Sequence, residues 1–395
     1  MFDSNQHPLK VLAVLPVLGQ PRHAKRIEML KQAGFEVRAA AFERPYHKGR
    51  LPKCELVVLG TIEHGKLLRR IWRLLRAIPA LRREICSSDC IYASGLDSAL
   101  LAICASFPRA LPLAMEVGDI REAQTAPRMH GVVMRMLDRF VCRHASLLAV
   151  TAEKFYSVYY KSWIGAHTPA VVLENKLEKG FVDSLAVSAR IASPDGTPLV
   201  DRPMRIGYFG LLRCPWSWDV LRDLAANHRE RVELVIAGRA IEPSDLEEQA
   251  KAFPNMRYLG EYKSPQDLER LYTQVDLVWA CYPPLGSHDW NLRWARPNRF
   301  YESCCFFRPL LSREGSCDSV DVRRFGIGLC INEDEPHAAA SRIAEITPED
   351  LTRWRASMME VPRSVYTYTD EVARLGVAIR SMFCTSGRPT IREHS

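Results

Sequence analysis

Residues 10–41 read KVLAVLPVLGQPRHAKRIEMLKQAGFEVRAAA, and this stretch decides the fold class. It opens with an apolar run, residues 10–18, which predicts a strand buried on both faces of a sheet. An amphipathic helix is predicted over residues 22–33, and Gly34 ends it before the next strand-like run, residues 36–41. A strand, a helix and a strand in this order predict a parallel sheet covered by helices.

The same alternation continues along the chain and is interrupted once, at residues 184–203, where Ser, Pro, Gly and Asp gather as in an interdomain linker. We therefore expect an α/β protein of two Rossmann-like domains whose parallel sheets face each other across a cleft. The expected parts are a first domain at 1–185, a linker at 186–203, a second domain at 204–363, and at 364–395 a C-terminal helix packing back on the first domain. Strand-like runs are expected at 55–59, 90–93, 113–117, 147–150, 170–173, 205–209, 232–237, 256–259, 277–279, 309–312 and 328–331, and the last helix at 366–382.

Composition agrees with a soluble protein of this size. The 395 residues are 47% hydrophobic and 25% charged, which excludes a disordered or fibrous chain. The longest charge-free runs have 12 residues, whereas a membrane-spanning helix needs about 20. The twelve cysteines include no C-x-x-C pair, so we expect buried free thiols in a reducing cytoplasm and no metal site.

Two loops of the first domain follow predicted strands and carry candidate functional residues. Gly19 begins the first, GQPRH, at the start of a helix whose free N–H groups suit an anion, but the loop is not the G-x-G-x-x-G motif of dinucleotide cofactors. The second places Glu116 and Asp119 after residues 113–117, where the two carboxylates could orient sugar hydroxyls or accept a proton. The alternative is that they are solvated loop acids, one of which caps the next helix.

Two stretches of the second domain carry further candidates. Gly210 permits close approach to the backbone, and the guanidinium of Arg213 suits phosphate oxygens; the alternative is that Arg213 is a surface arginine. Pro297 suits the first turn of a helix, so the segment from Asn298 begins with N–H groups able to hold a diphosphate. Glu302 lies four residues beyond, on the same face, where its oxygens can accept from both hydroxyls of a ribose.

Four pieces, in chain order across both domains, resemble glycosyltransferases of the GT-B architecture. The sequence is most similar to glycosyltransferase family four, in its polysaccharide and glycoconjugate assembly branch. The pieces are the glycine loop before RIEMLKQAGFEV (26–37), RIGYFGLLR (205–213), NMRYLGEYKSPQDLERLYTQVDLV (255–278) and PNRFYESCCFFRPLLS (297–312).

The resemblance implies a retaining transfer from a nucleotide-sugar donor, held by the second domain, to a glycan acceptor held by the first, without a metal or other cofactor. Glu302 matches the glutamate that grips the ribose, and Asn298 and Arg299 match the start of the diphosphate-binding helix. Arg213 matches the arginine of the phosphate loop, and Tyr262 lies in the loop that contacts the base.

The sequence departs from the family pattern at the first of two signature glutamates, where Trp294 stands. Asp289, Asn291 and, from the first domain, His23 are then the candidate sugar contacts. Two rival functions stay open: a nucleotide-sugar 2-epimerase, and an inactive relative that binds nucleotide sugar or a partner transferase. The candidate catalytic residues are Glu116, Asp119 and Arg213, and Gly19 and Gly210 are candidate donor contacts.

A strongly basic segment, residues 64–83, stands out from a chain with a net charge of +8. Its pattern predicts an amphipathic helix that lies on an anionic membrane surface, at the cytoplasmic face, and the resemblance implies a lipid-linked acceptor there. The alternative is a core-packing helix with an arginine-rich outer face. No nucleic-acid reader motif is present. The candidate membrane contacts are Arg69, Arg70, Trp72, Arg73 and Arg76.

Overall fold

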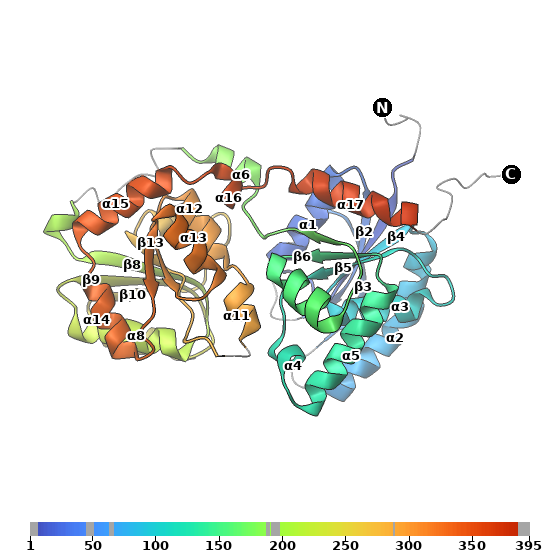
Figure 1. Ribbon diagram of the computed structural model, residues 1–395, viewed down its shortest axis with the longest axis horizontal. Coiled ribbons are helices and arrows are strands. Elements are labelled where there is room, and N and C mark those ends of the chain that lie inside the picture. Colours follow the sequence, from blue (N-terminus) through green and yellow to red (C-terminus); the bar gives the residue numbers. More distant parts are fainter. Residues whose placement is uncertain are drawn as a thin grey trace. The chain divides into compact units, whose positions relative to one another are not determined.

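The computed structural model describes residues 7–44, 51–62, 67–186, 190, 198–286 and 289–385 (Figure 1). The chain forms two compact units, the first containing residues 1–175 and 370–395 and the second residues 176–369. Most of the expected linker, at 187–189 and 191–197, lies outside the described residues. The two parallel sheets predicted from the alternation are present, one in each unit.

The first unit is built on a seven-stranded sheet in the order β3-β2-β1-β4-β5-β6-β7, in which every pairing is parallel. The order reverses at β1, so the loops after β1 and β4 separate and leave room for a ligand at the carboxyl edge. The strands are β1 (Lys10–Leu15), β2 (Glu36–Glu43), β3 (Glu55–Thr61), β4 (Cys90–Ser94), β5 (Leu113–Val117), β6 (Leu147–Val150) and β7 (Ala170–Val172).

Helices cover both faces of this sheet, as right-handed crossovers require. One layer contains α1, which contacts α17, and the other contains α3, which contacts both α2 and α5 (Figure 1). The helices are α1 (Pro21–Gln32), α2 (Leu67–Cys86), α3 (Leu96–Ser106), α4 (Glu122–Thr125), α5 (Met129–His144), α17 (Glu371–Thr385) and the π-helix η1 (Phe155–Ile164).

Helix α17 brings the end of the described chain back to the first unit. Its side chains Leu375, Ile379 and Met382 are buried. Two arginines fasten the helix to the backbone: Arg374 donates to the carbonyl oxygen of Val172 at 3.2 Å, and Arg380 to that of Ala33 at 2.7 Å. A single helix over 366–382 was expected. The structure has two, because Thr367 forms a β-bridge with Leu177 and holds the intervening chain extended.

The second unit has a six-stranded parallel sheet in the order β10-β9-β8-β11-β12-β13. Its strands are β8 (Met204–Leu212), β9 (Val232–Ala240), β10 (Met256–Tyr258), β11 (Leu277–Trp279), β12 (Leu310–Arg313) and β13 (Gly328–Ile331). Its helices are α6 (Lys179–Ser184), the short 3-10 helix η3 (Leu199–Asp201), α8 (Pro215–Asn227), α9 (Leu246–Lys251), α10 (Leu268–Tyr272), α11 (Trp290–Trp294), α12 (Asn298–Cys305), α13 (Cys317–Phe325), α14 (Pro336–Ala344), α15 (Pro348–Met359) and α16 (Arg363–Tyr366).

Strand β8 is longer than the sequence pattern indicates. We expected it to end at Phe209, but it continues through Gly210, which pairs with Gly238 of β9. The backbones cross so closely that a Cβ on Gly238 would lie 1.8 Å from the carbonyl oxygen of Gly210. Gly210 itself has a φ of 119° and open space where a Cβ would be. The two glycines therefore keep the strands paired to the edge of the sheet.

No helix among the described residues is long and apolar enough to cross a membrane.

Candidate functional sites

A cavity of about 250 Å³ opens in the first unit, at the carboxyl edge of the sheet. It brings together three predicted residues from separate parts of the sequence: His23 from α1, and Glu116 and Asp119 from the end of β5 and the loop after it. Gly19 does not line it, but its φ of 84° turns the chain from β1 toward α1. Other polar side chains around the cavity are Gln20, Arg22, Arg44, Ser94, Arg121, Gln124 and Tyr160.

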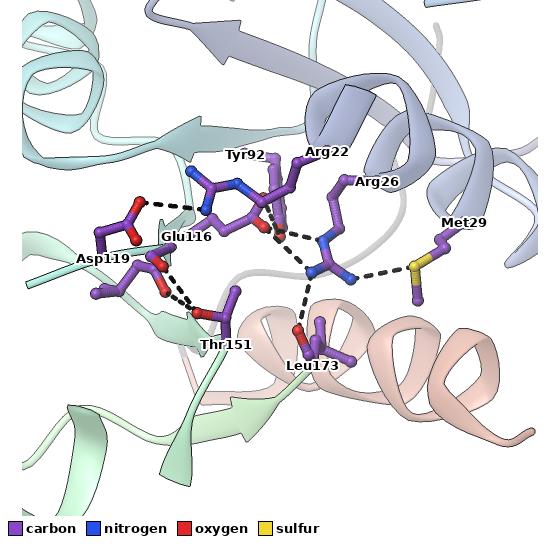
Figure 2. A network of polar contacts seen from close by, with 10 residues as sticks. Arg22, Arg26, Met29, Tyr92, Glu116, Asp119, Thr151 and Leu173 are labelled. Atoms are coloured by element: carbon purple, nitrogen blue, oxygen red, sulfur yellow. Dashed lines mark hydrogen bonds and ion pairs between the residues drawn. The ribbon is translucent and has the colours of Figure 1, made fainter. Parts of the chain in front are cut away.

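Glu116 is the centre of a buried polar network (Figure 2). Its Oε1 accepts from Arg26 Nε at 3.2 Å and from Arg26 Nη2 at 3.1 Å, and its Oε2 accepts from the Tyr92 hydroxyl at 3.0 Å. Arg26 also donates to the carbonyl oxygen of Leu173 at 3.1 Å. The network ties α1 to β4, to β5 and to the loop after β7, and so fixes the backbone that frames the cavity.

The environment of Glu116 decides its charge. Burial alone would raise the pKa of this carboxyl, but the positive charges of Arg26 and Arg22, with His23 nearby, outweigh burial and lower the pKa overall. Glu116 is therefore an ionised hydrogen-bond acceptor at neutral pH. The alternative of a solvated loop acid is wrong for Glu116, which is 2% exposed.

His23 lies against this network with no hydrogen-bond partner for either ring nitrogen among the described residues. It is 2% exposed, and burial lowers its pKa from 6.5 to about 4. The imidazole is therefore neutral at pH 7, with one nitrogen able to donate and the other to accept. The hydroxyl of Ser94, at the end of β4, is likewise buried and has no hydrogen-bond partner in the part of the chain that the structure describes. A ligand hydroxyl in the cavity would satisfy both groups.

Asp119 is the exposed acid of this edge. Its Oδ2 lies 3.4 Å from Arg22 Nη1, and its side chain is 55% exposed. Gly118 makes room for that contact, because a Cβ there would lie 2.1 Å from Arg22 Nη1. The residue that caps the next helix, α4, is Arg121, so neither of the two acids is the helix cap.

A second buried acid, Asp138 on α5, holds two side chains of the cavity wall. Its Oδ2 accepts from Gln124 Nε2 at 2.8 Å, and its Oδ1 accepts from the Tyr160 hydroxyl at 3.2 Å. Tyr159 donates to Oδ2 at 2.6 Å. Both tyrosines belong to the π-helix, whose wider turn presents successive residues to one carboxylate. Asp138 thus positions Gln124 and Tyr160 in the cavity wall but does not itself line the cavity.

In the second unit, the predicted donor residues gather around α12. Glu302 is 4% exposed, and its Oε2 accepts from the Tyr272 hydroxyl at 2.7 Å. Tyr262 is close enough that burial, with the negative charge of Glu302, raises the pKa of its phenol. The helix begins with Pro297 as its N-cap, not within its first turn, and the proline side chain makes no cap hydrogen bond to the helix N–H groups.

Arg299 links α12 to the middle of β8. Its Nη1 donates to the carbonyl oxygen of Phe209 at 3.3 Å, and its guanidinium lies 4.9 Å from the centre of the Tyr208 ring. Phe209 directly precedes Gly210, so Glu302, Tyr262, Arg299 and the Gly210 backbone belong to one region of the second unit.

The remaining predicted residues of the second unit are less closely tied to this region. The side chain of Arg213 is exposed. Asn298 is exposed at the first turn of α12. Asp289 accepts from the backbone N–H of Gly286 at 2.8 Å, which closes its own loop. Asn291 and Trp294 lie on α11, where Trp294 packs on Trp290 with ring centres 4.8 Å apart.

The predicted membrane residues belong to α2. Trp72 and Arg76 are exposed, and Arg73 is half-buried and donates to the carbonyl oxygen of Thr61. The side chains of Arg69 and Arg70 lie outside the described residues. The helix packs on the unit through Ala77, Leu81 and Ile85, which are buried.

Sequence reasoning missed the partners that hold these sites. Arg26 occupies the same helical face as the buried Ile27 and Leu30, and Glu116 is the acid in the apolar strand LAMEV. A cation on an apolar helix face and an anion in an apolar strand each require an opposite charge when they are buried. This sequence signal could have predicted that Arg26 and Glu116 form a pair. Tyr272 and Ser94 carry no comparable signal.

Among the described residues, no group of three or more His, Cys, Asp or Glu side chains could hold a metal ion.

The geometry of both units resembles known proteins, although no protein-family model matches the chain. The succinoglycan biosynthesis protein ExoL of Rhizobium meliloti (strain 1021) is 28% identical over 348 residues, which are 86% of this chain and 85% of that protein.

Three solved structures show the fold. Sucrose-phosphate synthase from Thermosynechococcus elongatus has a TM-score of 0.72 at 12% identity, covering 95% of this chain and 100% of that one. Anabaena HepE in complex with UDP and glucose has a TM-score of 0.65 at 14% identity, with coverages of 95% and 100%. A Listeria monocytogenes protein proposed to be a UDP-N-acetylglucosamine 2-epimerase has a TM-score of 0.59 at 13% identity, with coverages of 97% and 99%. The fold is GT-B, as the resemblance predicted.

Proposed function

We propose that this chain is a glycosyltransferase that moves a sugar from a nucleotide-sugar donor to a glycan acceptor in cell-surface polysaccharide assembly. The observation that carries the proposal is the buried Glu302 of α12, held by Tyr272 beside Tyr262 and Arg299. These are positions that the family resemblance assigns to ribose, base and diphosphate. The relation to ExoL, a succinoglycan biosynthesis protein, supports the polysaccharide context.

Donor binding follows from the chemistry of this region. A buried carboxylate accepts from two neighbouring hydroxyls, as a ribose offers. The N-terminus of α12, where the N-cap Pro297 makes no side-chain hydrogen bond, places positive dipole charge where a diphosphate would lie, with Arg299 and Arg213 as the cations. In a retaining transfer without a metal, these groups would stabilise the negative charge that grows on the departing diphosphate.

The cavity of the first unit is the proposed acceptor site. His23 and Ser94 supply unpartnered donors and acceptors suited to sugar hydroxyls, and Asp119 is the exposed carboxylate that could take a proton. Glu116 shapes the site through Arg26 and stays ionised. We further propose that the acceptor is lipid-linked and that the enzyme works at the cytoplasmic surface of the membrane, since α2 presents exposed Trp72 and Arg76.

A panel of nucleotide sugars tested by thermal unfolding examines the donor proposal. A ligand at one hundred times its Kd stabilises a protein by about 2.7 kcal/mol, so the true donor should raise the Tm clearly above that of the others. No shift with any member of the panel would contradict donor binding.

A 2-epimerase is the second candidate, because the fold is shared with the Listeria protein. The two activities differ in their products. Donor incubated with the protein in the absence of acceptor should remain unchanged or release free sugar if the chain is a transferase. Conversion of the donor to its 2-epimer would establish the other activity, and no reaction even with acceptor would indicate an inactive relative.

A further inference from the structure

Helix α5 turns a row of large apolar side chains toward solvent. Met129, Val133 and Met136 are 77%, 51% and 60% exposed, and Val132 and Phe140 are 38% and 41% exposed. Their positions, 129, 132, 133, 136 and 140, follow the spacing of one helical face. The opposite face carries the buried residues Gly131, Asp138, Val141 and Cys142. Single exposed apolar residues are ordinary, but a row of five on one helix marks an interaction surface.

The exposed charged side chains that α5 itself contributes beside this row have one sign. Arg139 and Arg143 on α5 and Arg128 at its N-cap are exposed, and Arg139 also donates to the carbonyl oxygen of Ile164 at 3.1 Å. The only acid within α5 is Asp138, which is 0% exposed and is bonded to Gln124 and both tyrosines. The outer side of α5 is therefore apolar and cationic, a combination that matches the boundary between acyl chains and anionic headgroups.

A second helix continues the same surface. On α2, Trp72 and Leu75 are 60% and 52% exposed, and the guanidinium of Arg76 lies 5.7 Å from the centre of the Trp72 ring. Helix α3 contacts both α2 and α5, so the three form one layer on the same side of the sheet (Figure 1). Because crossover helices run opposite to parallel strands, Trp72 and Met129 both lie toward the carboxyl edge, where the cavity opens.

We propose that the outer faces of α5 and α2 together dock on an anionic lipid bilayer. Met129, Met136 and Phe140 enter the boundary of the acyl chains, and the arginines contact headgroup phosphates. A second copy of the chain is a poorer occupant, because packing two α5 faces together would place arginine against arginine with no exposed acid on the helix to neutralise them. The inference rests on the membrane-linked acceptor proposed above and adds the side chains that touch the lipid.

The test is cosedimentation of the full chain with vesicles, without donor or acceptor. The wild type should bind vesicles of phosphatidylglycerol and phosphatidylcholine, and should not bind vesicles of phosphatidylcholine alone. The variant Met136→Ser/Phe140→Ser should lower the partition coefficient at least tenfold, because both side chains leave the acyl boundary. The variant Arg128→Gln/Arg143→Gln should lower it at least tenfold at low salt. Val377→Ser, a 68% exposed valine on α17, is the matched control and should bind as the wild type does.

Unchanged vesicle binding by Met136→Ser/Phe140→Ser would overturn the proposal. So would a lipid-free dimer of the wild type that this variant dissociates, because the row would then cover a second copy. Nucleotide-sugar binding, measured on the same preparations, separates the docking surface from the proposed donor binding. If the protein binds nucleotide sugar but does not bind vesicles, only the docking surface is refuted. Both substituted side chains are exposed, and an unchanged urea midpoint verifies that the variant is folded.

Discussion

At the scale of single residues, the donor proposal depends on the charge of Glu302. Glu302→Gln keeps the side-chain volume and an acceptor for the Tyr272 hydroxyl, but removes the charge that the ribose hydroxyls would meet. Losing one charge-assisted bond costs about 1.5–3 kcal/mol, so donor affinity should fall about tenfold to a hundredfold in titration calorimetry. Glu269→Gln, an exposed acid on the neighbouring α10, should bind donor normally. Equal affinity in the two variants would place the donor elsewhere.

His23 gives the first unit a predictable pH dependence. Its pKa in the folded chain is about 4, below the ordinary value of 6.5, so the unfolded chain binds more protons between these values. Its contribution to stability is thus fully present above about pH 6.5 and is lost as the pH falls toward 4. At 1.36 kcal/mol per pKa unit the loss is about 3 kcal/mol. In urea unfolding at several pH values, the wild type should lose that much more stability than His23→Gln. Parallel pH curves would show that His23 titrates normally.

At the scale of elements, α17 is the last helix of the described chain, and it belongs to the first unit although the second unit precedes it in the sequence. Leu375 of α17 is fully buried in the first unit, whereas Val377 on the same helix is 68% exposed. Leu375→Ala should destabilise the first unit by about 2–5 kcal/mol, and Val377→Ala should have little effect. Nucleotide-sugar binding, which belongs to the second unit, should persist in both. Loss of donor binding in Leu375→Ala under native conditions would contradict this division.

The elements also show what the sequence can and cannot predict. Every strand of both sheets was expected near its observed place, because strands buried on both faces read as apolar runs such as those at Lys10 and Val232. The predicted end of β8 was wrong. The strand is extended by the pairing of Gly210 with Gly238, which lies on the neighbouring strand β9. The apolar row on α5 was also missed, because an apolar helical face reads as core until the packing shows which side is covered. Arg26, Tyr92 and Tyr272 act through partners brought close by folding.

At the scale of the whole molecule, the two units divide the proposed work. The second holds the buried Glu302 and the start of α12 for the donor, and the first holds the cavity with His23, Ser94 and Asp119 for the acceptor. A nucleotide sugar should therefore protect the second unit from limited proteolysis more than the first, because ligand binding stabilises the part that binds. Equal protection of both units, or protection of the first alone, would contradict this assignment.

The central claim is sugar transfer, and the most direct measurement follows a radiolabelled sugar from the donor identified by thermal unfolding into a lipid-extractable glycan. The wild type and Glu269→Gln should label the glycan fraction and release nucleoside diphosphate in equal amounts, and Glu302→Gln should label it at least tenfold more slowly at subsaturating donor. Label that stays in the nucleotide sugar, or appears there as an epimer while the glycan fraction remains unlabelled, would contradict the account.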